Sequence, residues 1–229
     1  MALTDSLIEY WKMEDANGVR NSINLTQTGT PTKGTGIILN GRVYSANNYD
    51  NFTYSSALGA GTFSWWFNYT SVLGNQGRMI NKTHAAVSDV IVFDISGTPT
   101  PGLLEVTIHD VGGLNANATT LSTGTWYFYA VTWDGSHVIV YKNGAVETNN
   151  TNAVTMNADA TVFSIGGTPV NTAGINGTVD EIGFWSRALT STEISRLYNG
   201  GAGLTYPFHN LSFKTNNLRP RAFAPGLSR

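Results

Sequence analysis

Two adjacent carboxylates, Asp180 and Glu181, stand inside the segment GTVDEIGFWSRALTSTEISRLYNGG, which covers residues 177–201. A pair of acids could hydrolyse a glycosidic bond if the two carboxyl groups faced each other across about 5 to 10 Å. In an extended strand, however, successive side chains point to opposite faces. We therefore expect Asp180 to share a face with Ile182 and Phe184. Its neighbour should point the other way, so that the two acids cannot flank one bond.

Other acids and nucleophiles form no catalytic set in the sequence. Asp89 and Asp94 are five positions apart, which places them on opposite faces of a strand, and Glu105 shares a face with His109 but has no acidic partner. The four histidines are scattered, the chain has no cysteine, and it contains no nucleophile elbow and no phosphate-binding loop. We predict that the protein is not an enzyme.

Asp180 is also a candidate metal ligand, because a carboxylate on an otherwise apolar face is costly unless it is paired or binds a cation. Calcium takes oxygen ligands from carboxylates, amides and backbone carbonyls. The segment EDANGVRNSIN (14–24) offers such oxygens on Glu14 and Asn21. The sequence thus predicts either a Ca²⁺ ion held by Asp180, Asn21 and Glu14 or a structural aspartate that is satisfied by hydrogen bonds.

A sugar site is the third kind of chemistry that the residues suggest. Such sites combine exposed aromatic faces with Asn, Asp and backbone donors on loops. The segment RVYSANNYDNFTYSS (42–56) has this composition, although any aromatic strand with polar turns has it too. The ligand-binding residues that it predicts are Tyr44, Tyr49, Phe52 and Tyr54.

The elements that must carry these residues are strands. Short segments rich in aromatic and β-branched residues alternate in polarity and are bounded by Gly, Asn, Asp or Ser, which is typical of strands. Their spacing favours antiparallel sheets stacked as a sandwich over a βαβ arrangement. A tight hairpin turn is expected at Asp134-Gly135. The predicted strands are TFSWWFNY (62–69), DVIVFDIS (89–96), LLEVTIHD (103–110), TWYFYAVTW (125–133), HVIVYKNG (137–144) and TVFSIGG (161–167).

One short helix is predicted after residue 190. Thr190 is a typical N-cap, Glu193 is its capping-box partner, and Gly200 follows as the residue that stops the helix. Because an isolated helix of about two turns is marginal in water, it must be held by packing. We expect Ile194 and Leu197 to lie against the sandwich.

Charge and hydropathy exclude some partners. The formal net charge of −2 indicates no nucleic-acid partner. The N-terminus has neither the basic nor the apolar region of a signal peptide, and no apolar run is long enough to cross a bilayer, so no membrane partner is expected. Residues 1–204 hold all 15 acidic residues and 9 of the 13 basic ones. Residues 1–204 therefore carry a net negative charge and residues 205–229 a net positive charge.

The last 25 residues, TYPFHNLSFKTNNLRPRAFAPGLSR (205–229), contain three prolines and show no sustained periodicity, which predicts an extended arm. A disordered tail is the alternative. Its aromatic side chains are too apolar for a solvated linker and are expected to seek a partner surface. The predicted partner-binding residues are Phe208, Phe213, Arg219, Arg221 and Phe223.

The segment 177–201 closely resembles the closing signature of laminin-G-like jelly rolls of the concanavalin A-like lectin/glucanase superfamily. GTWYFYAVTWDGSHVIVYKNG (124–144), GTFSWWFNY (61–69) and LIEYWKMED (7–15) resemble earlier strands of the same family, in the expected order. The resemblance implies an all-β fold, a two-sheet antiparallel jelly-roll sandwich over residues 1–204 with one short helix near its end. It also implies that Asp180-Glu181 belongs to the scaffold, with a cation nearby in some members.

Two departures from the family pattern affect the expected function. Many relatives carry Asp-x-Ser-Gly in the first loop, where this chain has Arg20-Asn21-Ser22-Ile23, and the loss of that acid weakens the case for calcium. The acidic motif of laminarinase-type glucanases is missing, which argues against hydrolysis.

By analogy with family members in virions, we expect a non-enzymatic bacteriophage structural protein of the decoration, head-fibre or receptor-binding kind, assembled in the host cytoplasm. Residues 205–229 would bind other virion proteins or copies of the chain, and the body could meet a cell-surface glycan. The alternatives are a free carbohydrate-binding module and a glycoside-cleaving enzyme.

Overall fold

The computed structural model describes residues 1–45, 48–72, 76–82, 91–96, 102–108, 114–117, 120–151, 156, 162–168 and 174–209. Four of the predicted partner-binding residues lie outside these ranges: Phe213, Arg219, Arg221 and Phe223. Asp89 and His109 lie outside them as well.

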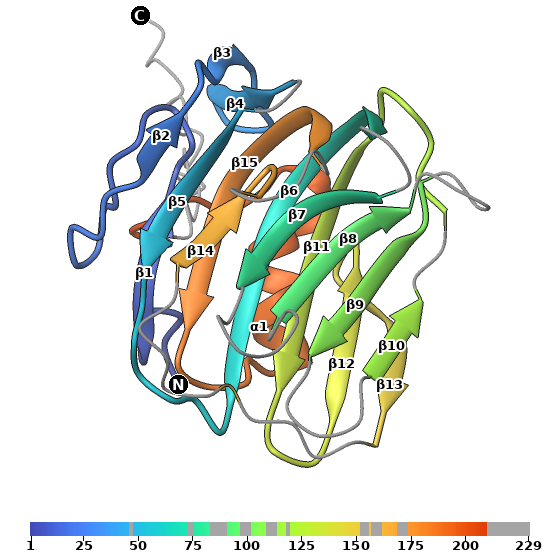
Figure 1. The fold of residues 1–229 in the computed structure, drawn as a ribbon. Helices are drawn as coiled ribbons and strands as arrows, with labels where there is room; N and C mark the ends of the chain where they lie inside the picture. Colours follow the sequence, from blue (N-terminus) through green and yellow to red (C-terminus); the bar gives the residue numbers. More distant parts are fainter. Residues whose placement is uncertain are drawn as a thin grey trace, which may run out of the picture.

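Two antiparallel sheets are stacked face to face (Figure 1), as the strand spacing predicts. Within the described residues the first sheet has eight strands. In order these are β13 (Ala145–Asn150), β12 (Val138–Lys142), β11 (Trp126–Trp133), β6 (Gly61–Val72), β15 (Ile175–Trp185), β4 (Asn40–Tyr44) and β3 (Thr32–Thr35), with β1 (Leu7–Trp11) also paired to β15.

The second sheet has seven strands within the described residues. Its order is β10 (Leu114–Asn117), β9 (Leu104–Ile108), β8 (Ile91–Ser96), β7 (Gln76–Lys82), β14 (Val162–Ile165), β5 (Tyr49–Thr53) and β2 (Thr26–Thr28). Sequence neighbours such as β7, β8 and β9 pair in series, whereas β6 and β15 pair across more than a hundred residues. The predicted all-β jelly-roll sandwich is confirmed.

The hairpin between β11 and β12 turns at Asp134-Gly135, as the sequence predicts. Gly135 has φ +83°, and the Asp134 carboxylate accepts hydrogen bonds from the amides of Ser136 at 2.8 Å and His137 at 2.7 Å. Glycine reaches positive φ without steric cost, and a short acidic side chain can bond to the amides of the turn it begins.

The core between the sheets is largely aromatic. The rings of Phe63 on β6 and Phe184 on β15 stack with centroids 4.2 Å apart, and those of Phe52 and Phe163 stack at 4.8 Å. Alternation along each strand turns these side chains inward, and large rings supply much apolar area per residue. Phe52 is only 4% exposed, so its ring serves this core.

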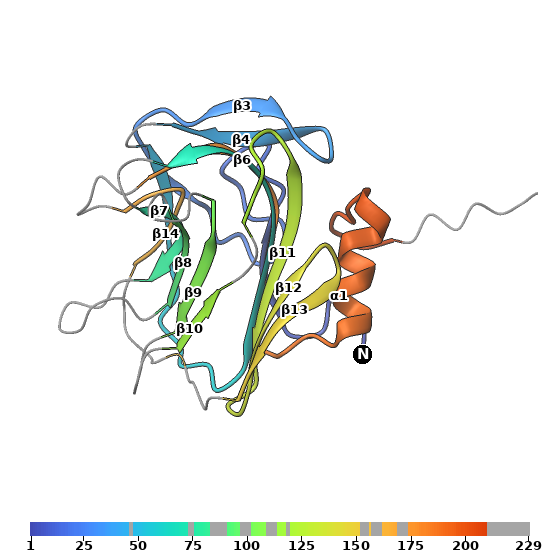
Figure 2. The same cartoon turned by 90° about the vertical axis from the view of Figure 1, so that its right-hand side faces the viewer.

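A third layer lies on the outer face of the eight-stranded sheet (Figure 2). It consists of helix α1 (Ser191–Tyr198), the 3-10 turn η1 (Asn199–Gly201) and the N-terminal residues beside them. The capping box of Thr190 and Glu193 is present as predicted, and Ile194 and Leu197 pack with Trp185 in a second apolar cluster. The left-handed stop begins at Asn199, one residue before the predicted Gly200.

Residues 204–209, here called the strap, fold back over this layer. The Phe208 ring meets Tyr10 edge to face at 5.1 Å and stacks on Trp185 at 6.3 Å, and it is only 7% exposed. This corrects the expectation that the free arm starts at residue 205 and that Phe208 binds a partner. Its ring finds burial on its own subunit, because β1 and β15 already present an aromatic surface there.

Among the residues that the structure describes, no helix combines the length and the apolar character needed to cross a membrane.

Candidate functional site

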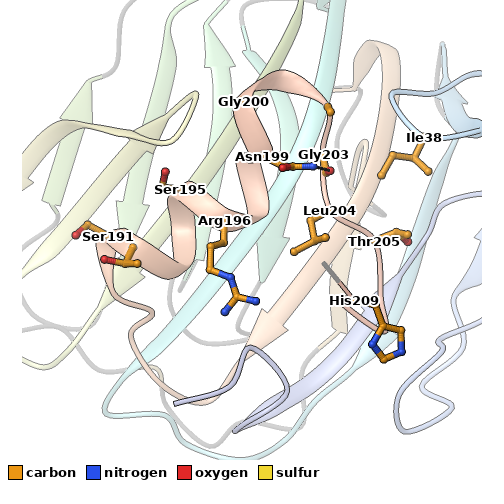
Figure 3. Close-up of a pocket in the computed structure, with 12 residues that line it drawn as sticks. Ile38, Ser191, Ser195, Arg196, Asn199, Gly200, Gly203, Leu204, Thr205 and His209 are labelled. Carbon is orange, nitrogen blue, oxygen red and sulfur yellow. Dashed lines mark hydrogen bonds between the residues drawn. The ribbon is translucent and has the colours of Figure 1, made fainter. Parts of the chain in front are cut away.

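An open groove of about 1110 Å³ lies between helix α1 and the strap. Figure 3 shows Ser191, Ser195 and Arg196 on the helical side, with Ile38, Leu204, Thr205 and His209 on the other. The remaining lining residues are Thr192, Asn199, Gly200, Ala202 and Gly203. Two segments far apart in sequence therefore contribute: the β3–β4 turn, and the continuous stretch from α1 through η1 to the strap.

The described residues that line the groove are rich in hydrogen-bonding groups and include no acid. Ser191, Thr192 and Ser195 bring exposed hydroxyls, while Arg196 and His209 are exposed groups that can carry positive charge. Asn199 is used structurally, since its side-chain amide donates to the Gly203 carbonyl at 2.8 Å. These groups can hold a polyhydroxylated ligand or an anion, and the part of the lining that the structure describes offers no carboxylate for hydrolysis or metal binding.

A bidentate ion pair holds α1 in place. The two terminal nitrogens of Arg187 donate to the carboxylate of Glu193 at 2.8 and 2.6 Å, and the Thr190 amide donates to the same carboxylate at 2.9 Å. Burial raises the pKa of Glu193, but these hydrogen bonds lower it by a larger amount, so that the pKa lies at about 2. The helix that forms one wall of the groove is therefore anchored by an ionised acid.

Asp180 fixes the opposite wall. Its carboxylate accepts hydrogen bonds from the amides of Ile37 at 2.9 Å, Ile38 at 3.0 Å and Glu181 at 3.0 Å, and it is fully buried. Burial raises its pKa, the amides lower it, and the charge of Glu181 raises it again, so that the pKa lies at about 8. This geometry matches the predicted alternative of a structural aspartate.

A β-bulge changes the direction of Glu181. The register of β15 against β6 shifts between Asp180 and Gly183, and Glu181 has φ +50°. Ile182 and Phe184 point into the core between the sheets, whereas both acids point to the outer layer. The expectation that the acids lie on opposite faces is wrong, because one extra residue in the bulge restarts the alternation.

Glu181 is buried against oxygen atoms rather than cations. It is 2% exposed, and the hydroxyls of Tyr10 and Thr205 lie beside its carboxylate. Burial raises its pKa, whereas the nearby hydroxyls of Tyr10 and Thr205 lower it, and the pKa lies at about 7. The two acids cannot act on a substrate, since Asp180 is held by three amides and Glu181 lies beneath Thr205.

Asn21, another predicted calcium ligand, stabilises the first loop. The Asn21 side chain donates to the Ile8 carbonyl, and its backbone amide donates to Glu9 at 2.9 Å. Within the described residues, no three His, Cys, Asp or Glu side chains gather in a way that could hold a metal ion. With Asp180 already bonded to three amides, the set of Asp180, Asn21 and Glu14 does not fit Ca²⁺ well, and that site stays a prediction.

Sequence reasoning missed the role of Glu9. Its carboxylate is fully buried and accepts hydrogen bonds from four backbone amides: Tyr10 at 2.8 Å, Arg20 at 2.6 Å, Asn21 at 2.9 Å and Ile23 at 2.8 Å. The sequence did contain a signal for this role, namely an acid in the middle of the apolar strand LIEYW. A carboxylate buried at such a position needs hydrogen-bond donors around it.

Two of the predicted sugar-binding aromatics are buried, which corrects that expectation. Tyr44 is 0% exposed and its hydroxyl donates to Asp50 at 2.6 Å, and Phe52 belongs to the core. Tyr49 is half-buried, and Tyr54 packs edge to face on Phe184 at 5.2 Å. A strand that closes a sandwich turns alternate rings inward, so composition alone could not identify a sugar-binding surface.

A pair of acids that the sequence did not reveal lies on the seven-stranded sheet. Asp94 on β8 is the cross-strand neighbour of Glu105 on β9. Arg78 on β7 lies on the other side of Asp94 and forms an ion pair with it at 3.1 Å. The cross-strand register brings the two acids together. The guanidinium of Arg78 pairs with Asp94, so this acid has a structural role.

Residues 26–195 match the model of the concanavalin A-like lectin/glucanases superfamily. The chain therefore belongs to that family. Among curated protein sequences, none matches the chain.

Solved structures share the fold at low sequence identity. Domain 4 of AbnA, a GH43 extracellular arabinanase from Geobacillus stearothermophilus, in complex with arabinotriose, has a TM-score of 0.71 and 16% identity, covering 83% of this chain and 97% of that one. The binding domain of Paraclostridial Mosquitocidal Protein 1 has a TM-score of 0.70 and 12% identity, covering 86% and 52%. The binding domain of botulinum neurotoxin DC in complex with rat synaptotagmin II has a TM-score of 0.66 and 12% identity, covering 86% and 52%. The chain thus spans about half of each toxin binding domain.

Proposed function

We propose that this protein is a non-enzymatic recognition module that binds an oligosaccharide in the groove between α1 and the strap. The observation that carries the proposal is the lining of the groove, in which serine and threonine hydroxyls lie beside Arg196 and His209, with no acid among the described lining residues. Hydroxyl and guanidinium groups bind the hydroxyls and carboxylates of sugars by hydrogen bonds.

Membership of a lectin and glucanase family supports a saccharide ligand, as does the solved domain in complex with arabinotriose. The solved toxin domain in complex with synaptotagmin II supports recognition of a protein receptor by the same fold. We favour the saccharide because hydroxyl and charged groups are prominent among the described residues of the lining, and such groups can bond to the many hydroxyls of a sugar.

Charge narrows the ligand class. Residues 1–204 carry an excess of acids, yet the groove lining, as far as the structure describes it, contains one arginine, one histidine and no acid. A neutral or acidic oligosaccharide is therefore favoured over a basic one.

The test is a binding screen of the full chain on an array of neutral and acidic oligosaccharides that includes arabinotriose, followed by calorimetry on the strongest binder. Arg196→Ala should weaken binding about tenfold or more, because a charge-assisted hydrogen bond is lost. Arg20→Ala removes the same charge from another exposed site and should leave the affinity unchanged. No binding on the array, or equal affinity of the two variants, would contradict the proposal.

A second candidate role rests on the charge of the C-terminal segment. We propose that the module is displayed on a bacteriophage virion and attached through the part of the arm beyond the strap, which contains Lys214, Arg219, Arg221 and Arg229 and no acid. Removal of residues 210–229 should then abolish incorporation into particles or self-association while leaving saccharide binding intact. Retained incorporation would overturn this role alone.

A further inference from the structure

A second pocket, of about 490 Å³, lies beside the same helix as the groove. Its lining includes Arg187, Ala188 and Glu193, and it shares Thr192 and Arg196 with the groove. Residues four positions apart on a helix lie one above the other on one face, so these two shared side chains form a ridge on α1. The groove and the second pocket therefore meet at this ridge.

The other charged side chains of the second pocket are already paired with each other. Arg187 uses all five of its N–H donors: two bond to the Glu193 carboxylate at 2.8 and 2.6 Å, and three bond to backbone carbonyls at 3.1 to 3.5 Å. Because the acid is ionised, the pair has no net charge, and its guanidinium has no donor left for a ligand.

Arg196, on the ridge, is different. Its side chain is exposed, and among the described residues it makes no hydrogen bond and no ion pair. An unpaired guanidinium offers a planar fork of N–H donors that matches the two oxygens of a carboxylate. His209, which can also carry positive charge, lies on the strap across the groove (Figure 3). A ligand that crosses the ridge would therefore meet an unpaired cation between two hollows.

We propose that this site binds a uronate-containing oligosaccharide that crosses α1, with its carboxylate on Arg196 and its remaining sugar residues in the groove and the second pocket. The inference rests on the proposed function, because it names the ligand of the same site. A pocket for one drug-sized ligand has about 300–1,000 Å³. The groove has about 1110 Å³ and the second pocket adds about 490 Å³, so the two together suit a chain of several sugar residues.

The test uses the full chain on an array of neutral and uronate-containing oligosaccharides, from disaccharides to hexasaccharides, with each uronate present as the free acid and as its methyl ester. The free acid should bind about tenfold more tightly than the ester, because the ester loses the charge-assisted contact. Equal affinity of the two forms, or a preference for neutral chains, would overturn this inference and leave the proposed function standing. No binding to any saccharide would overturn both.

Variants show whether Arg196 is the source of the preference for the free acid. In Arg196→Gln the preference should fall below about threefold, because the amide bonds to both forms. Arg20→Gln removes the same charge from another exposed site and should keep the tenfold preference. His209→Gln should weaken the binding of both forms alike. A preference that persists in Arg196→Gln, or that disappears in His209→Gln, would overturn the assignment.

The second pocket is tested through the length of the chain. In the wild type the affinity should rise about tenfold from the disaccharide to the hexasaccharide, since longer chains reach both hollows. Ala188→Trp should remove most of this gain by filling the second pocket, whereas Ala57→Trp places the same ring at another exposed position and should keep the gain. If Ala188→Trp fails to fold, the wild-type series decides. Affinity that is independent of chain length, or a gain that survives Ala188→Trp, would overturn the role of the second pocket.

Discussion

The carboxylate of Asp180 accepts a hydrogen bond from the backbone amide of Ile38, which lies 142 residues earlier in the chain. The same oxygen accepts a hydrogen bond from the amide of Ile37. Asp180 on β15 therefore holds the β3–β4 turn through two backbone amides of that turn. Ile38 lines the groove, and Leu39 beside it is 75% exposed with φ +56°. An acid buried in the scaffold thus positions one wall of the candidate ligand site.

Replacing Asp180 with alanine should lower the free energy of unfolding by about 2–4 kcal/mol, because three backbone amides would lose their acceptor in a buried place. Urea denaturation measures this change. The control Asp15→Ala removes an exposed acid that accepts one local bond from Asn17, and it should cost less than about 1 kcal/mol. Similar losses for the two variants would contradict the anchoring role.

A second approach to the same contact leaves the carboxylate in place. A Cβ atom at Gly36 would lie 2.5 Å from the Asp180 oxygen that holds the turn. Gly36→Ala should therefore destabilise the protein and weaken saccharide binding together, because the turn must move away from the acid. Calorimetry and urea denaturation on one sample would test whether the two effects occur together.

Glu9 should prove as important to stability as Asp180. Glu9→Ala leaves four buried or half-buried amides without their acceptor, and we expect a loss of about 3–4 kcal/mol. Hydrogen exchange should show lost protection at Arg20, Asn21 and Ile23, whose amides donate to this carboxylate. Glu14→Ala serves as the control in the same loop, and unchanged protection in Glu9→Ala would refute the assignment.

The ion pair of Arg187 and Glu193 predicts a pH dependence. The pKa of Glu193 is lowered to about 2 in the folded chain and is near its ordinary value in the unfolded chain. The stabilisation of the folded state by the ionised carboxylate is therefore complete at pH values above the ordinary pKa. It is lost as the pH falls from about 5 toward 2. The wild type should therefore lose roughly 1–3 kcal/mol over this range through Glu193 alone.

Urea denaturation of Glu193→Gln and wild type between pH 6 and pH 3 checks this dependence. The stability difference between the two proteins should shrink on acidification, because the carboxylate that is protonated in the wild type is absent from the variant. A constant difference across the range would show that Glu193 contributes only through its shape.

Phe208 separates the strap from the rest of the tail. Phe208→Ala should cost about 3–4 kcal/mol, because the ring is buried against Tyr10 and Trp185. Deletion of residues 210–229 should leave Tm within about 2 °C of the full chain, whereas deletion from residue 205 should lower it strongly, since it uncovers that aromatic surface. Thermal unfolding of the two truncated chains compares them directly, and equal Tm values would count against a packed strap.

Much of the architecture follows from local patterns. The hairpin at Asp134-Gly135 and the capped helix after Thr190 form as predicted, because both depend on residues only a few positions apart. The acceptor role of Glu9 and the burial of Tyr44 were not predicted, since they depend on loops and strands that approach only after the sheets form.

The sequence by itself determined many of the strands, the hairpin turn, the short helix and the family, because hydrophobic period and turn chemistry act over neighbouring residues. Only the tertiary structure decided the surroundings of the two acids. The bulge at Glu181 broke the alternation that the sequence implies, and cross-strand register placed Asp94 beside Glu105. Register and bulges depend on contacts between segments distant in the chain, so they cannot be read from one segment alone.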